Sequence, residues 1–372
     1  MKIAIVHDYL NQYGGAEKVV EVLHELFPEA PIYTSIYDQD KLPDSFKKMN
    51  IVTSFMQKLP FLEKHFKKYL LFYPRAIENF DLKEYDLILS SSIAFSKGAI
   101  KSSKACHICY CYTPMRFVWD YEHYVNKENF GSLTLKLLPL AIKKLKKWDL
   151  KTIDRVDYYI AISNYIKDRI KRFYNRDSVV IYPPVNVKEF KLTKNVEDFF
   201  LIVSRLNAYK NIDLVIQVFN ELGLKLKIVG TGPYRPVLQS LVKSKNIEFL
   251  GRLSNDEIKE IYSKCKAYIF PGKEDFGISP VEAQAAGRPV IAYADGGALE
   301  TVVDGITGLF FRENSIAALK ETIKNFLSIE NKFNSKEIIQ NALRFDKEIF
   351  KNSITEFIIQ KYGEYNSKSE IK

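Results

Sequence analysis

Short apolar runs alternate with helical patterns twice along this chain, and this double alternation restricts its fold more than any other feature. The predicted strands are 2–6, 86–89, 105–111, 158–162 and 179–182 in the first half, and 199–203, 226–229, 247–250, 267–270, 290–292 and 308–311 in the second. Helical patterns lie between the strands, among them 165–173, 211–222, 255–264 and 280–286. Strands separated by helices predict parallel sheets with helices on both faces. We therefore expect an α/β protein with two Rossmann-like domains in tandem and a ligand cleft between them.

The length of the chain fits this two-domain expectation. Roughly 150 residues per domain gives about two domains for 372 residues. Pro183–Pro184 ends the last strand of the first half, because proline cannot donate a hydrogen bond within a sheet. The polar stretch 186–198 is typical of a linker. We predict domains at 1–185 and 198–345, then a C-terminal helix with a polar tail after Tyr362.

Composition and cysteine usage exclude several classes of protein. Hydrophobic residues make up 47% and charged residues 27%, the balance of a globular protein with a core. No stretch reaches the roughly 18 apolar residues of a membrane-spanning helix. The first apolar run, 3–6, is too short for a signal peptide. We expect a cytoplasmic protein whose cysteines are free thiols, namely Cys106, Cys109, Cys111 and Cys265.

The net charge of +10 is concentrated in the first half of the chain. Residues 1–182 contain 28 Lys and Arg against 21 Asp and Glu, and the basic residues cluster in 58–75 and 133–148. Both segments mix lysines with large apolar side chains, as interfacial amphipathic helices do. We expect them to dock on an anionic membrane surface at the inner face of the cytoplasmic membrane; the alternative is a solvated face over a core helix. Zinc-finger and RNA-recognition signatures are absent from the sequence, so we expect no nucleic acid partner.

The strongest chemical signal is the segment 274–282, which follows a predicted buried strand and opens a helix. A helix N-terminus presents free N–H groups and the positive end of its dipole to an anion. Glu274 and Glu282 can each accept hydrogen bonds from sugar hydroxyls beside that anion. This arrangement suits a nucleotide sugar, which carries a sugar at each end of a diphosphate. Alternatively, Ser279, Pro280 and Glu282 form a capping box that only stabilises the helix. Glu274 has no such local explanation.

A second signal follows the first strand of the second half. Arg205 and Lys210 lie where open α/β sheets bind ligands, and both can hold a diphosphate. The alternative is a solvated pair of surface cations. Gly230-Thr231-Gly232 follows the next strand and permits close approach of a ligand, although short glycine turns are common.

Together, these motifs resemble the retaining glycosyltransferase family 4, which has the two-domain GT-B architecture. The resemblance covers 2–362, and its motifs are Gly14-Gly15-Ala16-Glu17, Ser204-Arg205-Leu206 with Lys210, Gly230-Thr231-Gly232, Glu274 and Glu282 with seven residues between them, and Gly296-Gly297-Ala298-Leu299-Glu300. It implies an acceptor-side domain at 1–185 and a nucleotide-sugar donor domain at 198–345, with parallel sheets facing a central cleft. The helix of 346–372 would cross back onto the first domain.

The resemblance also assigns roles to single residues. The implied donor-binding residues are Gly14, Gly15, Arg205, Lys210, Gly230, Glu274, Phe276, Gly277, Ile278 and Glu282. Arg205 and Lys210 would hold the phosphates, Glu274 the donor sugar, and Glu282 the ribose. Neither a divalent metal nor another cofactor is expected, because cationic side chains and helix N-termini can stabilise the leaving diphosphate.

The segment 110–120 is similar to one in bacterial polysaccharide and O-antigen mannosyltransferases, many of which use GDP-mannose. That segment usually has His before Thr-Pro, whereas this chain has Tyr112. The expected catalytic residues are Glu274, Arg205, Lys210 and Tyr112. The expected reaction moves mannose from GDP-mannose, with retention, onto a polysaccharide or lipid-linked oligosaccharide. The alternatives are a UDP-sugar donor, a GT-B sugar-nucleotide epimerase, or a non-catalytic protein that binds sugar nucleotides.

Candidates for contact with the acceptor come from the first half: His7, Asp8, Arg116 and Asp120. His7 and Asp8 end the first predicted strand and face the expected cleft, or else they only cap a turn. The D-x-D spacing at 38–40 stands among turn residues, so we interpret it as a solvated loop rather than a metal site. We interpret the cysteines of 106–111 as buried strand thiols.

Overall fold

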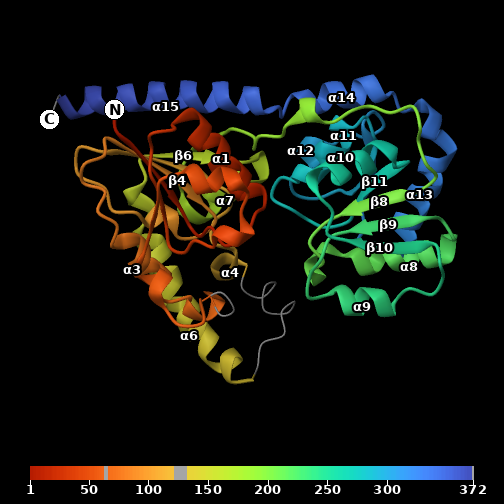
Figure 1. Ribbon diagram of the computed structural model, residues 1–372, viewed down its shortest axis with the longest axis horizontal. Coiled ribbons are helices and arrows are strands. Elements are labelled where there is room, and N and C mark those ends of the chain that lie inside the picture. Colours follow the sequence, from red (N-terminus) through yellow and green to blue (C-terminus); the bar gives the residue numbers. More distant parts are fainter. Residues whose placement is uncertain (63–65, 121–131, 371–372) are drawn as a thin grey trace. The chain divides into compact units, whose positions relative to one another are not determined.

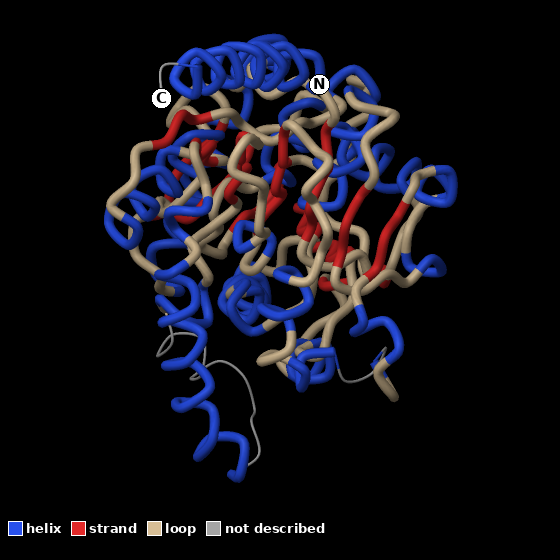
Figure 2. Tube along the Cα trace, turned by 90° about the vertical axis from the view of Figure 1, so that its left-hand side faces the viewer, coloured by secondary structure: helices blue, strands red, loops and turns tan. Residues whose placement is uncertain are grey.

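The computed structural model of the chain describes residues 1–62, 66–120 and 132–370 (Figure 1). The chain divides into two compact units. The first comprises Met1–Pro184 together with the chain from Phe350 onward, and the second comprises Val185–Ile349. Each unit contains a parallel sheet with helices packed outside the strands, as Figure 2 shows.

Within the described residues, the first unit has a seven-stranded parallel sheet in the order β3-β2-β1-β4-β5-β6-β7. Its strands are β1 (Ile3–His7), β2 (Ile32–Thr34), β3 (Ile51–Thr53), β4 (Leu87–Ser92), β5 (Cys106–Cys111), β6 (Tyr158–Ala161) and β7 (Ser178–Val180). The central strands are buried on both faces, which explains their continuous apolar runs. The five strands expected from the sequence are present, and β2 and β3 are additions at one edge.

The helices described within the first 184 residues are α1 (Gly15–Leu26), α3 (Tyr73–Glu78), α4 (Arg116–Trp119), α6 (Ser132–Lys151) and α7 (Asn164–Tyr174). Short 3₁₀ helices connect them, namely η1 (Gln39–Lys41), η2 (Asp44–Lys48), η3 (Phe55–Lys58), η4 (Phe66–Tyr69), η5 (Ser96–Gly98) and η6 (Ile153–Arg155). Helix α7 begins as expected after Ser163, whose side chain accepts a hydrogen bond from the N–H of Ile166. Helix α6 continues through Pro139 and projects beyond the rest of this unit in both views (Figures 1 and 2).

The described second unit has a six-stranded parallel sheet in the order β10-β9-β8-β11-β12-β13. Its strands are β8 (Phe200–Val203), β9 (Leu226–Val229), β10 (Ile247–Gly251), β11 (Ala267–Phe270), β12 (Val290–Tyr293) and β13 (Gly308–Phe311). Its helices are η7 (Val187–Glu189), η8 (Ala208–Lys210), α8 (Ile212–Leu222), α9 (Arg235–Ser240), α10 (Asn255–Lys264), α11 (Ile278–Ala285), α12 (Ala298–Thr301), α13 (Ile316–Ile329), η9 (Glu330–Lys332) and α14 (Ser335–Leu343). All six strands expected from the sequence are present.

The C-terminal helix α15 (Lys347–Glu370) returns to the first unit, as the family resemblance implied. The ring of Phe350 packs edge-on against Tyr110, with 5.7 Å between ring centroids. The hydroxyl of Tyr365 donates to the carbonyl of Ser103 at 3.1 Å. The polar residues after Tyr362 continue the helix to Glu370, and the contact of Tyr365 holds these turns against the unit.

Candidate functional site

In the second sheet, the strand order reverses between β8 and β11. At such a switch point the loops after the two strands diverge and leave a crevice outside the carboxyl ends of the strands, where open α/β sheets bind ligands. Lys210 follows β8 and Glu274 follows β11, so the sheet brings together two predicted site residues that are 64 positions apart.

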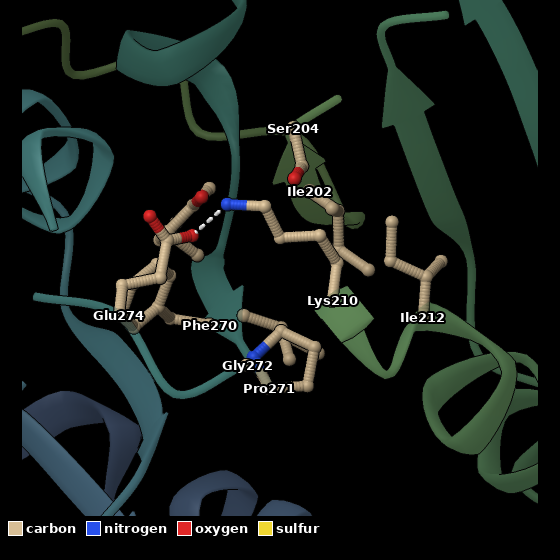
Figure 3. Close-up of a pocket in the computed structure, with 10 residues that line it drawn as sticks. Ile202, Ser204, Lys210, Ile212, Phe270, Pro271, Gly272 and Glu274 are labelled. Carbon is tan, nitrogen blue, oxygen red and sulfur yellow. Dashed lines mark hydrogen bonds and ion pairs between the residues drawn. The ribbon is translucent and has the colours of Figure 1, made fainter. Parts of the chain in front are cut away.

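Lys210 and Glu274 form an ion pair across this switch point (Figure 3). The Lys210 side chain is largely buried, and its Nζ also lies 5.0 Å from the centroid of the Tyr209 ring. The pair stands at a pocket lined by Ile202, Ser204, Lys210, Ile212, Tyr268, Ile269, Phe270, Pro271, Gly272 and Glu274. A cation and a carboxylate thus lie together in a pocket whose other lining side chains are mostly apolar. Such a pair can hold an anion and a hydroxyl group side by side.

The loop after β12 supports the backbone of Glu274. The N–H of Gly297 donates to the carbonyl of Glu274 at 2.9 Å, and Gly296 has a left-handed φ of 62°. A Cβ at Gly296 would overlap the carbonyl oxygen of Glu274. Only glycine fits there. The predicted motif at 296–300 therefore holds the Glu274 loop in place.

The loop after β9 supports the Arg205 segment in the same way. Gly230 has a φ of 126°, and a Cβ there would overlap the carbonyl oxygen of Ser204. The N–H of Leu206 donates to the carbonyl of Thr231 at 2.9 Å. The close approach expected at this glycine loop is thus made by the neighbouring loop, and contact of Gly230 with a donor stays a prediction. Arg205 itself is exposed after β8.

The start of α11 contradicts the capping-box alternative. The N-cap residue is Gly277, with a φ of 91°, and no side chain caps this end of the helix. Ser279 and Pro280 lie inside the first turn, so they cannot act as the cap. Glu282 instead accepts a hydrogen bond from the hydroxyl of Tyr262 at 3.3 Å. The first turn of α11 therefore presents backbone N–H groups beside Glu274, as an anion site requires.

In the first sheet, the order reverses between β1 and β4, and Tyr112 follows β5 directly. The Tyr112 hydroxyl lies 2.9 Å from Oγ of Ser91 and donates to the carbonyl of Ala16 at 3.1 Å. Burial raises the pKa of Tyr112 well above its ordinary value, so the phenol stays protonated. Its contact with a sugar stays a prediction.

The acceptor-side candidates have partners within the first unit. Both oxygens of Asp8 accept hydrogen bonds, at 2.5–2.7 Å, from the four backbone N–H groups of 93–96. Asp120 forms a bidentate ion pair with Arg169. These contacts give both carboxylates structural functions, which favours the capped-turn alternative for Asp8. Contact of Asp8, Asp120, His7 or Arg116 with an acceptor stays a prediction.

Sequence reasoning missed Ser91, which contacts Tyr112. The available signal was the run Ser90-Ser91-Ser92, three hydroxyls at the carboxyl end of an otherwise apolar strand. In the D-x-D segment, Asp38 pairs with Lys41 at 2.5 Å. Within the described part of the chain, all four cysteines are buried thiols.

Two family models match the chain side by side. Residues 13–189 match Glycosyltransferase Family 4, and residues 185–344 match Glycosyl transferases group 1. The boundary between the matches coincides with the boundary between the two units at Val185.

Individual proteins are similar to the chain over shorter stretches. An uncharacterized glycosyltransferase of Methanocaldococcus jannaschii is 33% identical over 195 residues, which cover 51% of this chain and 55% of the relative. The O-antigen chain mannosyltransferase RfbU of Salmonella typhimurium is 34% identical over 151 residues, which cover 38% of this chain and 43% of the relative. The chain thus spans about half the length of these curated relatives.

A solved structure extends the likeness to nearly the whole fold. HepE of Anabaena in complex with UDP has a TM-score of 0.72 at 16% identity, covering 97% of this chain and 100% of HepE. At that identity the likeness shows the fold, a GT-B pair of Rossmann-like domains. The chain is therefore composed of a glycosyltransferase family 4 domain at 13–189 and a glycosyl transferases group 1 domain at 185–344.

Proposed function

We propose that this protein is a retaining hexosyltransferase that moves mannose from GDP-mannose onto a polysaccharide or a lipid-linked oligosaccharide. The observation that carries the proposal is the Lys210–Glu274 pair beside the uncapped start of α11. The ammonium group and the helix N-terminus balance the charge of a diphosphate, and the carboxylate accepts hydroxyl groups of the donor sugar. The similarity to RfbU, an O-antigen chain mannosyltransferase, supports mannose as the hexose.

The transfer follows from positioning and charge stabilisation. The bond between the anomeric carbon and the diphosphate oxygen breaks, and an acceptor hydroxyl oxygen bonds to that carbon on the same face. The acceptor proton passes to the departing diphosphate. Arg205, Lys210 and the start of α11 stabilise the charge that develops on this leaving group. In this scheme neither a protein nucleophile nor a divalent metal takes part.

Ligand-induced thermal stabilisation tests the donor. The purified protein is heated with GDP, UDP or ADP, and then with the matching sugar nucleotides, in the presence of EDTA. A ligand that binds the native state raises Tm by mass action. We expect GDP and GDP-mannose to raise Tm. A shift with UDP alone would replace mannose by a UDP-sugar, the second candidate, which HepE in complex with UDP supports. No shift with any nucleotide would contradict the proposal.

Turnover assays separate transfer from the other two alternatives. With donor and a mannan or lipid-linked acceptor, we expect nucleoside diphosphate and an extended acceptor in equal amounts. Conversion of the donor sugar without any acceptor would indicate an epimerase. Donor binding without turnover, whichever acceptor is supplied, would indicate a non-catalytic binding protein.

We also propose that the first unit docks on anionic membranes, where a lipid-linked acceptor would be found. The structure brings the two basic segments into one hydrophobic cluster, through Leu62 and Tyr73 from 58–75 and Leu145 from 133–148. Each segment also has a largely exposed apolar side chain, Phe61 at 79% and Leu140 at 68%. Exposed lysines of the two segments are Lys58, Lys68, Lys143, Lys144, Lys146 and Lys147. Residues 63–65, and the side chains of 67 and 133–137, lie outside the described residues.

Vesicle sedimentation tests this docking. The protein is expected to sediment with vesicles that contain anionic lipid and to stay in the supernatant with vesicles of neutral lipid. Added salt should release the protein from the anionic vesicles. F61S and L140S should each weaken binding. I359S is the matched control, because Ile359 is 65% exposed on α15, outside both segments. Equal binding to neutral and anionic vesicles would contradict the proposal.

Across the described residues, none of the helices combines the length and apolar character needed to cross a bilayer.

A further inference from the structure

A chain of hydrogen bonds in the first unit connects the carboxyl ends of three strands. His7 ends β1, Ser91 lies on β4, and Tyr112 follows β5. Nδ1 of His7 lies 3.0 Å from the carbonyl oxygen of Ser91 and 3.1 Å from its Oγ. Ser91 Oγ lies 2.9 Å from the Tyr112 hydroxyl, which lies 3.1 Å from the carbonyl oxygen of Ala16. His7 and Ser91 are fully buried, and Tyr112 is 8% exposed.

The two carbonyl acceptors determine which group donates in each of these hydrogen bonds. The carbonyl of Ala16 can only accept, so the one hydrogen of Tyr112 points to it. Ser91 must then donate its hydroxyl hydrogen to Tyr112. Because the carbonyl of Ser91 also only accepts, Nδ1 of His7 carries a proton and donates it to Ser91. Each group therefore donates to the next one, in the order His7, Ser91, Tyr112 and the carbonyl of Ala16 in the first turn of α1.

A second hydrogen bond holds the same turn. One carboxylate oxygen of Glu17, a fully buried side chain, accepts from the backbone N–H of Gly14 at 2.8 Å. The other oxygen lies 3.9 Å from Nε2 of His7, which makes no hydrogen bond to any described residue. Ala16 and Glu17, which directly follow the glycine loop (residues 11–15), are thus held by the bond from the Tyr112 hydroxyl to Ala16 and by the bond between Gly14 and Glu17.

We propose that Tyr112 and Ser91 are positioning residues for the glycine loop. They hold Gly14 and Gly15 in the conformation that binds the donor diphosphate, and Tyr112 acts through Ala16 rather than on the sugar. The identity of the ligand in this inference rests on the proposed function, because the diphosphate belongs to the proposed sugar-nucleotide donor. It also accounts for a phenol at this position, because a neutral hydroxyl can donate to a carbonyl and accept from a serine at the same time.

The test compares two buried tyrosines that each lose a hydroxyl. In Y112F, the hydrogen bonds to Ala16 and Ser91 disappear. In Y110F, the matched control, a fully buried hydroxyl on β5 loses its bond to the carbonyl of Ile181, 2.9 Å away. Calorimetric titration with GDP and with UDP measures Kd, and thermal unfolding measures Tm. We expect Y112F to raise Kd about ten-fold and Y110F to leave it within about two-fold, with similar losses of Tm.

A second pair keeps the inference testable if Y112F does not fold. S91A removes the link between His7 and Tyr112. S90A, one position earlier on β4, removes a buried hydroxyl that contacts Nε2 of His107 at 2.8 Å. S91A is expected to raise Kd, and S90A is not.

Hydrogen exchange adds a measurement that needs no ligand. Amides of 11–17 should exchange faster in Y112F and S91A than in the wild type, and remain protected in Y110F and S90A. Equal Kd and equal exchange in Y112F and Y110F would overturn the inference. If the wild type binds neither GDP nor UDP, the proposed function fails, while the exchange result still decides whether these residues order the loop.

Discussion

At the scale of single residues, the second unit joins two opposite charges that the sequence separates by 64 positions. Lys210 reaches Glu274 because β8 and β11 are neighbours in the sheet. The carboxylate is fixed by this contact and the backbone of Glu274 by the N–H of Gly297, so the proposed binding of a donor sugar requires little reorganisation.

K210A and E274Q are therefore expected to lower kcat/KM for transfer by about 100-fold or more, because each removes a preorganised charge at the reacting group. The measurement is release of nucleoside diphosphate with saturating acceptor, with circular dichroism to verify folding. K320A is the control, since Lys320 also pairs with a glutamate of the second unit, Glu221, but on its surface. Full activity in both site variants would refute the assignment of this pair.

A buried histidine makes stability depend on pH. Burial lowers the pKa of His107 from 6.5 to about 3 in the folded protein. Between these values the unfolded chain binds more protons, so the free energy of unfolding falls as the pH drops below about 6.5. At pH 5 we expect a loss of about 2 kcal/mol from this residue relative to neutral pH.

Urea unfolding at pH 7 and pH 5 measures this loss, which should be much smaller in H107Q. H24Q is the comparison, because His24 on α1 is only partly buried. The assignment to His107 fails if the two variants keep the same pH dependence as the wild type.

At the scale of elements, a buried ion pair anchors the C-terminal half of α6. Nζ of Lys97, which is 1% exposed, lies 3.0 Å from Oδ1 of Asp149 and donates to its carbonyl at 2.9 Å. The indole of Trp119 donates to the other carboxylate oxygen of Asp149 at 2.8 Å. The turns of α6 after Pro139 are thus held to the sheet side of the unit by Asp149, through Lys97 and Trp119.

K97M is expected to destabilise the protein by about 3–5 kcal/mol, because it leaves the Asp149 carboxylate buried without its counter-charge. Chemical unfolding provides the measurement. K41M, which removes a lysine from the surface pair with Asp38, should cost less than about 1 kcal/mol. Similar losses in the two variants would show that burial does not determine the strength of the Lys97 pair.

At the scale of the whole molecule, the chain forms two units, and α15 belongs to the one formed by the start of the sequence. Both tryptophans of the chain, Trp119 and Trp148, lie in this first unit. Their fluorescence therefore reports its unfolding separately from that of the second unit.

F350A is expected to destabilise the first unit by about 3–5 kcal/mol, because it leaves a cavity under α15. Trp fluorescence during thermal unfolding should show a lowered transition. F345A is the matched control: Phe345 is as buried as Phe350 but packs on Phe276 in the second unit. It should leave the fluorescence transition in place. A shift of equal size in both variants would mean that the two units unfold as one.

The sequence alone determined the features that depend on near neighbours. The strands β8 and β11, which have runs of buried apolar residues, were predicted to within one residue, because apolar runs between turn signals are local patterns. The edge strands β2 and β3 have three residues each, too few for any periodicity to be detected. The motifs around Lys210 and Glu274 identified the candidate donor site.

Only the tertiary structure decided which polar side chains already have partners. Asp8 accepts from 93–96, Asp120 pairs with Arg169, and Tyr112 donates to Ala16. The physical reason is that these partners lie 49 to 96 positions apart in the sequence, and the strand order brings them together. A sequence shows which side chains can form hydrogen bonds, whereas the strand order of the sheet determines which partner each one reaches.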